Sequence, residues 1–285
     1  MNGSEIKEKL HSGECVFGTH IASLMNPVAA SMAAEMELDF AFFCTEHMPL
    51  DRTEVSLLCK IYAARRISPV VRVPACDASI ISAALDGGAE GIVVPYIETV
   101  EEVRRAVGAV KYRPIKGKLL AEVLSGRKTL PESTQAFLGD FNDGKYLIVG
   151  IESMEAIDNL EELITVDGVD GVFLGPHDIT VSMGIPTEYN NPLFLNTIED
   201  IVRRCRRHSV GVGLHTLLLT LDEQYLRRLL DAGMNWILNG ADITVMRDAM
   251  NTQLRSLRRL AGNIPFHAPP SNATAPVQSC LVPGK

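Results

Sequence analysis

The chain has 285 residues, 46% of them hydrophobic and 22% charged, and a formal net charge of -8 at pH 7. These proportions exclude a largely disordered chain, and the acidic balance without long basic runs argues against a nucleic-acid partner. No apolar stretch approaches the roughly 20 residues that span a bilayer, so no membrane partner is expected. An N-terminus without signal-peptide order and six cysteines without a CxxC pair favour a cytoplasmic location with reduced thiols.

Short apolar runs alternate along the chain with segments of helical periodicity, which is typical of βαβ units around a parallel sheet. Eight such units in a chain of this length predict a single α/β domain, a (β/α)8 or TIM barrel. The strands are expected at Val16–Ile21, Phe40–Cys44, Val70–Val73, Gly91–Pro95, Leu147–Ile151, Val172–Leu174, Val210–Leu214 and Trp236–Asn239. The helices are expected at Pro27–Glu37, Arg52–Arg65, Ala78–Asp86, Thr99–Val110, Met154–Ile164, Pro192–His208, Asp222–Asp231 and Ile243–Leu260.

Signals at the helix ends support this division of the chain. Residues suited to capping a helix N-terminus are Asn26, Asp77, Asn191 and Thr220, and glycines suited to ending a helix are Gly87, Gly88 and Gly233. Residues 111–142 form an insertion with its own apolar run, Leu119–Leu124, which indicates a functional segment or an oligomer contact. The barrel domain is expected to cover residues 1–263, and the Pro-, Ala- and Ser-rich residues 264–285 are expected to be a disordered tail.

Polar residues follow several of the expected strands, and a barrel places its active site at the carboxyl ends of its strands. They are Thr45-Glu46-His47 after strand two, Arg72 in strand three, Glu152 after strand five, Gly175-Pro176-His177-Asp178 after strand six, and His215-Thr216 after strand seven. Glu152 and Asp178 lie at equivalent heights on consecutive strands, which suits two oxygen ligands of a hard cation. The alternative is that both carboxylates cap helices or form loop salt bridges. Free N–H groups at the Gly175-Pro176 turn are expected to bind a carboxylate.

His47 and Arg72 are candidates for acid–base and anion-binding roles. The position of His47 at the barrel mouth favours proton transfer, with a core or capping histidine as the alternative. An unpaired guanidinium within an apolar strand is costly, so Arg72 implies an anionic partner. That partner is a substrate carboxylate or, structurally, Glu46 or Asp86. Asp86 is otherwise an ordinary helix-end residue.

At these residues, from about Phe17 to Leu260, the chain resembles the HpcH/HpaI family of metal-dependent pyruvate aldolases. The resemblance rests on Phe43–His47, Pro69–Pro74, Leu85–Gly88, Gly91–Pro95, Gly150–Glu152 and, most specifically, Gly168–Asp178. It implies reversible cleavage of a 4-hydroxy-2-oxo acid into pyruvate and an aldehyde. In that reaction a metal ion stabilises the enolate as a Lewis acid.

The resemblance also implies roles for individual residues. Glu152 and Asp178 would hold Mg²⁺, Mn²⁺ or Co²⁺, Arg72 would contact the pyruvate portion, His47 would transfer protons, and Asp86 would orient His47. Gly150, Gly175, Pro176 and His177 would line the substrate together with Arg72. A homo-oligomer built from dimers is implied, up to a hexamer formed as a trimer of dimers, in which neighbours exchange the last helix, Ile243–Leu260.

Three departures from the family pattern concern the pocket rather than the metal ligands. Cys44 stands where the family usually has Asp, Gly150 replaces a Gln that commonly touches substrate, and the loop at Lys116–Lys118 is altered. His177 and His215 are atypical additions, which act as an extra ligand or base or merely line the loop. These departures leave two alternatives beside the aldolase: related enolate chemistry, such as oxaloacetate decarboxylation or a biosynthetic condensation, and a catalytically silent ligand-binding barrel.

Overall fold

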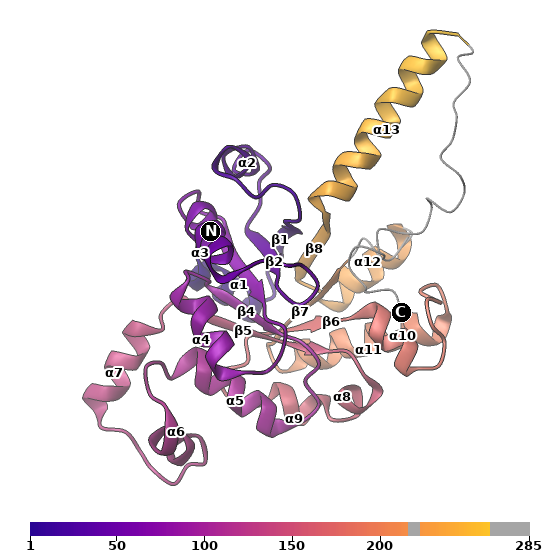
Figure 1. Cartoon of the computed structure of the whole chain (residues 1–285). Helices are drawn as coiled ribbons and strands as arrows, with labels where there is room; N and C mark the ends of the chain where they lie inside the picture. The colour runs from indigo at the N-terminus through magenta and orange to yellow at the C-terminus, as the bar shows by residue number, and fades with distance from the viewer. Residues whose placement is uncertain (216–222, 263–285) are drawn as a thin grey trace.

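The computed structural model describes residues 1–215 and 223–262, and it shows eight parallel strands closed into a barrel (Figure 1). Each strand pairs with its neighbours in chain order, and β8 pairs with β1 to close the sheet. The strands are β1 (Val16–His20), β2 (Phe40–Cys44), β3 (Ser68–Arg72), β4 (Gly91–Val94), β5 (Tyr146–Ile151), β6 (Gly171–Leu174), β7 (Gly211–His215) and β8 (Trp236–Ala241). The predicted (β/α)8 barrel is confirmed, and each strand ends within two residues of its expected bounds.

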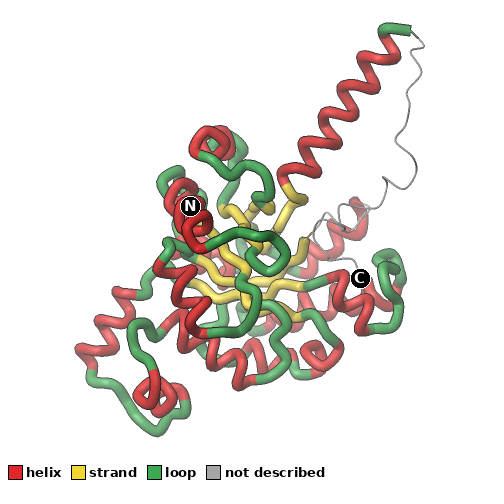
Figure 2. Tube along the Cα trace, in the orientation of Figure 1, coloured by secondary structure: helices red, strands yellow, loops and turns green. Residues whose placement is uncertain are grey.

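Helices surround the barrel (Figure 2). They are α1 (Gly3–Ser12), α2 (Pro27–Ala33), α3 (Arg52–Ala63), α4 (Ala78–Asp86), α5 (Val100–Lys111), α6 (Gly117–Leu124), α7 (Glu132–Phe141), α8 (Met154–Asp158), α9 (Leu160–Ile164), α10 (Pro176–Ser182), α11 (Pro192–Arg207), α12 (Glu223–Ala232) and α13 (Asp242–Leu260). The expected caps Asn26, Asp77 and Asn191 each accept a backbone N–H bond from the helix that follows. Thr220 and the tail 264–285 lie outside the described residues.

Most expected helices differ from their predicted bounds by one or two residues, two differ more substantially, and four of the described helices were not expected at all. The helix expected at Pro27–Glu37 ends at Ala33, and Glu37 has a left-handed φ of 55°, which a right-handed helix does not contain. The helix expected at Met154–Ile164 is divided at Asn159 into α8 and α9. The unexpected helices are α1, α6, α7 and α10. Of these, α6 and α7 occupy the insertion, and α6 buries none of its residues.

The first helix closes the end of the barrel opposite the predicted site. Its N-terminus is fixed by a capping box between Asn2 and Glu5, and its Ile6 and Leu10 side chains are fully buried beneath the barrel core. A Cβ on Gly211 of β7 would lie 2.6 Å from Leu10 Cδ2, so this position must lack a side chain for α1 to pack here. The N-terminal segment is therefore part of the barrel's core.

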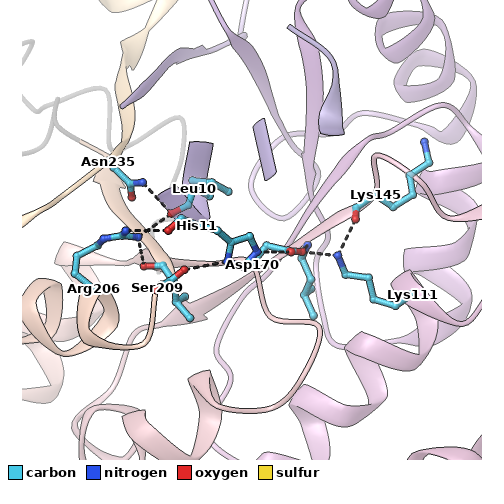
Figure 3. A network of polar contacts seen from close by, with 10 residues as sticks. Leu10, His11, Lys111, Lys145, Asp170, Arg206, Ser209 and Asn235 are labelled. Atoms are coloured by element: carbon cyan, nitrogen blue, oxygen red, sulfur yellow. Dashed lines mark hydrogen bonds and ion pairs between the residues drawn. The ribbon is translucent and has the colours of Figure 1, made fainter. Parts of the chain in front are cut away.

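A buried ion network fastens α1 to the barrel (Figure 3). Asp170, which is 4% exposed, accepts bonds from Lys111 Nζ at 2.5 Å and Leu147 N at 2.7 Å, and His11 Nε2 lies 3.1 Å from it. These contacts join α1, α5, β5 and the start of β6. A cavity of about 770 Å³ lies beside this network, at the opposite end of the barrel from Glu152 and Asp178. Since its buried charges are already paired with one another, we assign this cluster to structure.

Side chains alternate between the barrel interior and the helical layer, as the period of a strand requires. The lower interior is aromatic: Trp236 stacks on Phe40 at 4.7 Å between ring centroids, and Phe42 and Phe173 meet Trp236 edge-on. Gly18 is required here because a Cβ would lie 2.4 Å from the Phe40 ring. Above these rings the inward positions become polar, and this change marks the site.

Among the described residues, no helix has both the length and the apolar character needed to cross a membrane.

Candidate active site

Glu152 and Asp178 approach the same point at the carboxyl end of the barrel. Glu152 follows β5, and Asp178 lies in the first turn of α10, directly after β6. A Cβ built on Gly175 would lie 3.1 Å from the carboxyl carbon of Glu152 and 3.3 Å from Oδ2 of Asp178. Because glycine has no Cβ, the space between the two carboxylates stays open.

Burial and like charge destabilise the ionised form of Glu152. The residue is 4% exposed, and its Oε1 has no hydrogen-bond partner in the described part of the chain, whereas Asp178 is exposed. Burial raises the pKa of Glu152 to about 8; Arg72 opposes this shift, and Asp178 and Glu46 add to it. A cation would relieve the repulsion and satisfy the unpaired oxygen, so this donor set fits a divalent metal that prefers oxygen ligands.

The two carboxylates would leave most of a metal's coordination positions open. Within residues 1–215 and 223–262, no group of three or more His, Cys, Asp and Glu side chains is arranged to hold a metal ion. A cation at Glu152 and Asp178 would therefore depend on water and substrate for its other ligands. That arrangement is typical of catalytic rather than structural sites.

Arg72 is packed among a carboxylate, a thiol and two aromatic rings. Its Nε lies 3.0 Å from Glu46 Oε2, and its Cζ lies 5.7 Å and 5.8 Å from the ring centroids of Phe42 and Phe173. The structural alternative for Arg72, a salt bridge to Glu46, is therefore present. Since a guanidinium carries five N–H donors, this bridge leaves others to bind a substrate anion.

The thiol of Cys44 accepts hydrogen bonds from two neighbouring residues, Arg72 and His47. Its Sγ accepts bonds from Arg72 Nη2 at 3.1 Å, from Arg72 Nε at 3.4 Å and from the backbone N–H of His47 at 3.3 Å. The thiol is fully buried at the end of β2. Cys44 thus joins Arg72 to the loop that carries His47.

His47 lies between charges of opposite sign. Its Nε2 is 3.7 Å from Glu46 Oε2, and its side chain is 34% exposed. Burial lowers its pKa, as does Arg72, while Glu46 and Asp178 oppose the shift. The imidazole is accordingly neutral near pH 7, which is the form that accepts a proton.

The expected role of Asp86 in orienting His47 is not supported by contacts within one chain. Asp86 ends α4, its side chain is 71% exposed, and it pairs with Arg113 at the start of the insertion. Among the described residues, no hydrogen bond or ion pair joins Asp86 to Arg72 or to His47. Arg113 could not be foreseen as the partner because its position depends on the fold of the insertion.

Of the predicted substrate-binding residues, Gly150 lies at the carboxylate pair, and Gly175, Pro176 and His177 lie at the start of α10. Gly150 lies beside the carboxylate pair, since a Cβ there would be 3.0 Å from Glu152 Oε1 and 2.9 Å from Pro95 Cα. At the Gly175-Pro176 turn, the N–H of Gly175 is not free, since it donates to Ile151 O at 3.3 Å, and proline has no N–H. A carboxylate bound at this turn would therefore depend on the N–H groups of the residues that follow Pro176. His177 Nδ1 lies 3.0 Å from the hydroxyl oxygen of Tyr189, so one of its two ring nitrogens is already engaged by the protein.

Sequence reasoning missed His20, the last residue of β1. Its ring is 3% exposed and forms an edge-on contact with the His215 ring, with centroids 6.1 Å apart. The signal was the alternation of Val16, Gly18 and His20, which places His20 on the inward face of the strand. A histidine at the inward-facing end of a predicted strand could therefore have been predicted to lie at the barrel mouth.

Converging carboxylates, a buried arginine and a neutral histidine at a barrel mouth define a class of enzymes that stabilise anions formed from carbonyl substrates. The model of the HpcH/HpaI aldolase/citrate lyase family matches residues 21–249, and the chain belongs to this family. The predicted class, a carbon–carbon lyase of the aldolase type, is confirmed, and a catalytically silent barrel is not supported.

Two relatives and one solved structure illustrate this membership. A hydroxypyruvate/pyruvate aldolase of Roseovarius nubinhibens is 32% identical over 258 residues, which cover 88% of this chain and 96% of the relative. A 2-keto-3-deoxy-L-rhamnonate aldolase of Escherichia coli K12 is 29% identical over 248 residues, covering 87% and 91%. The structure of an HpcH/HpaI aldolase/citrate lyase family protein from Burkholderia cenocepacia J2315 has a TM-score of 0.74 at 26% identity and covers 90% of this chain and 99% of its own.

Proposed function

We propose that this enzyme cleaves, and in reverse forms, a 4-hydroxy-2-oxo acid through the enolate of a pyruvate-like fragment. The observation that carries the proposal is the convergence of Glu152 and Asp178 around Gly175, with Glu152 Oε1 buried and unpaired. We propose that this pair holds Mg²⁺, Mn²⁺ or Co²⁺, which are cations suited to carboxylate and water ligands. When bound, the cation supplies the Lewis acidity that polarises the 2-oxo group.

Arg72 is the proposed anion-binding residue. Its guanidinium is held by Glu46 and Cys44 on one side and by the Phe42 and Phe173 rings on another. These contacts fix the direction of its remaining N–H donors, so that no reorientation is needed as charge develops on the substrate. We propose that those donors bind the carboxylate and the enolate oxygen of the pyruvate fragment.

His47 is the proposed proton carrier. In the cleavage direction, Nε2 accepts the proton of the 4-hydroxyl group while the bond between the third and fourth carbons breaks. The electron pair of that bond passes to the pyruvate fragment as its enolate, and the fourth carbon leaves as an aldehyde. Glu46, 3.7 Å from Nε2, stabilises the imidazolium that forms, and condensation reverses each step.

The names of the relatives support small 2-oxo acids as the nucleophilic half, since these relatives are aldolases of hydroxypyruvate, pyruvate and a keto-deoxy sugar acid. We further propose a homo-oligomer in which α13 contacts a neighbouring copy. Its exposed apolar side chains recur every three or four residues along one face: Ile243, Met246, Met250, Leu254 and Leu257. We propose the cytoplasm as its compartment because the five described cysteines are free thiols.

Replacing the carboxylates tests the assignment of the site. Glu152→Gln and Asp178→Asn keep the shape of each side chain but remove its charge, so metal-dependent pyruvate release should fall at least about 100-fold in each. Glu155→Gln, at an exposed position three residues from Glu152, is the matched control and should retain full activity. Release would be measured across a panel of 4-hydroxy-2-oxo acids, with the unfolding temperature as a check on folding. Full activity in either carboxylate variant would overturn the assignment.

A further inference from the structure

Two histidines at the barrel mouth have no part in the proposed proton transfer or metal binding. His20 ends β1 and His215 ends β7, and the barrel order places only β8 between those strands. Both residues occupy inward positions, as the alternation along each strand requires. Their rings contact each other edge-on, with centroids 6.1 Å apart and an angle of 89° between the ring planes.

Each ring hides a nitrogen that has no partner. Neither Nε2 of His20 nor Nδ1 of His215 has a hydrogen-bond partner in the described part of the chain, although both atoms are shielded from solvent. His20 as a whole is 3% exposed. Leaving a buried polar atom unpaired costs on the order of 1–3 kcal/mol, so two adjacent cases point to a ligand that pairs them.

The charge around the rings determines what that ligand is. Burial lowers the pKa of His20 to about 3, and Arg72 and His47 lower it further; burial also lowers the pKa of His215 to about 3, with His20 and Arg72 contributing. Both imidazoles are therefore neutral, and each offers one N–H donor and one lone pair. A hydroxyl group donates and accepts, so it matches this pair. A further carboxylate on the substrate could only accept hydrogen bonds, so it would not match this pair. It would also be repelled by the carboxylates of Glu46 and Glu152 across the barrel mouth.

The placement of the pair relates it to the substrate. In the closed eight-strand order, β1 lies opposite β5, which carries Glu152, and Arg72 on β3 lies between them. The Phe42 ring, which supports Arg72 from below at 5.7 Å, also meets His20 edge-on at 5.5 Å. A substrate held at Glu152 and Arg72 therefore extends over an aromatic floor toward His20 and His215.

We infer that His20 and His215 form a subsite that recognises an alcohol hydroxyl on the substrate. This inference rests on the proposed function, because it names a substrate class for that same site. The hydroxyl comes from one of two sources: the 2-oxo acid half, as in hydroxypyruvate, or the aldehyde half, as in glycolaldehyde. In either case a hydroxylated substrate is preferred over its deoxy counterpart.

Matched substrate pairs measure this preference. One arm compares hydroxypyruvate with pyruvate against a fixed aldehyde, and the other compares glycolaldehyde with acetaldehyde against a fixed 2-oxo acid. In at least one arm, the ratio of kcat/KM for the hydroxylated over the deoxy substrate should fall about 10-fold or more in His20→Leu and in His215→Leu. His20→Gln and His215→Gln keep a donor and an acceptor and should retain more of the ratio. His208→Gln, at an exposed histidine, is the control and should leave it unchanged.

A binding measurement separates failure of this inference from failure of the proposed function. Hydroxypyruvate should raise the unfolding temperature of the metal-loaded wild type more than pyruvate does if the oxo acid is the source, and the difference should disappear in both Leu variants. Ratios unchanged in both Leu variants, in both arms, would overturn the subsite while leaving the lyase intact. If no substrate pair turned over, the lyase proposal would fail. Thermal shifts that were equal for the two oxo acids and also equal for glycolaldehyde and acetaldehyde would then overturn the subsite as well.

Discussion

The buried carboxylate of Glu152 destabilises the metal-free protein when it is ionised, but it is suited to bind a cation. The side chain is buried near Asp178 and Glu46, and its Oε1 has no partner among the described residues. Folding raises its pKa from its ordinary value to about 8, so the folded state holds this proton more tightly than the unfolded state. Glu152 therefore contributes stability at acid pH, which is lost as the pH rises through about 8. Cation binding would restore that stability.

A pH dependence of cation binding follows. Because the carboxyl group must lose its proton before it binds metal, affinity for Mg²⁺ should rise by about tenfold per pH unit below pH 8 and level off above it. The increase in unfolding temperature caused by Mg²⁺ should accordingly grow between pH 6 and pH 8. A scanning-fluorimetry series with and without Mg²⁺ measures this growth. An equal increase at every pH, or an unchanged series in Glu152→Gln, would contradict the role of this carboxylate.

Individual residues also show where the sequence was informative. The positions of Glu152, Asp178, His47 and Arg72 at the barrel mouth could be predicted, because strand ends in a barrel meet at one edge whatever the loops do. Their contacts could be predicted only in part, since a salt bridge from Arg72 to Glu46 was one of the expected alternatives. Glu46 proved to be the carboxylate shared by Arg72 and His47, and only the path of the loop after β2 decides that geometry.

At the scale of elements, strands were easier to predict than short helices. Buried parallel strands need continuous apolar runs, which stand out from any neighbouring sequence. By contrast, α10 is one and a half to two turns long and begins at Pro176, so its sequence has too few residues for a helical period to show. The first helix was missed for a different reason: its Ile6 and Leu10 pack into the end of the barrel, and this docking is a tertiary contact.

The last helix, α13, has few packing contacts with the rest of the described chain. It projects away from the barrel (Figure 1), and Thr244 is its only buried residue. Its apolar face carries Met250 and Leu254, which are 54% and 41% exposed. A continuous apolar stripe of this kind is usually covered by a partner, and a second copy of the chain is the partner we propose.

Charge placed on that stripe should separate the copies. Leu254→Glu introduces a charge that would be buried without a partner in the proposed contact, so the molar mass from light scattering should fall toward that of one chain. Thr252→Glu adds the same charge on the opposite face of α13 and should leave the mass of the assembly unchanged. If wild type already had the mass of a single chain, or if both variants behaved alike, α13 would not be the contact.

The whole molecule combines a rigid support with an open, charged mouth. One end of the barrel is closed by α1 and by the paired charges around Asp170, while the inward layer at the other end carries His20, Arg72, Glu152 and His215. Family membership accounts for the fold and for the class of chemistry. Cys44 and Gly150, the two pocket positions at which the sequence is predicted to depart from the family pattern, lie directly beside Arg72 and Glu152, so we expect them to bear on specificity more than on the fold.

Removal and restoration of the metal tests the central claim most directly. Purified wild-type protein would be treated with EDTA, dialysed and assayed for pyruvate release from 4-hydroxy-2-oxo acids, with Mg²⁺, Mn²⁺ or Co²⁺ added back in turn. We predict that release is lost on chelation and returns with at least one of these cations, while the protein stays folded throughout. Pyruvate release that persists at full rate without any divalent cation would contradict the account.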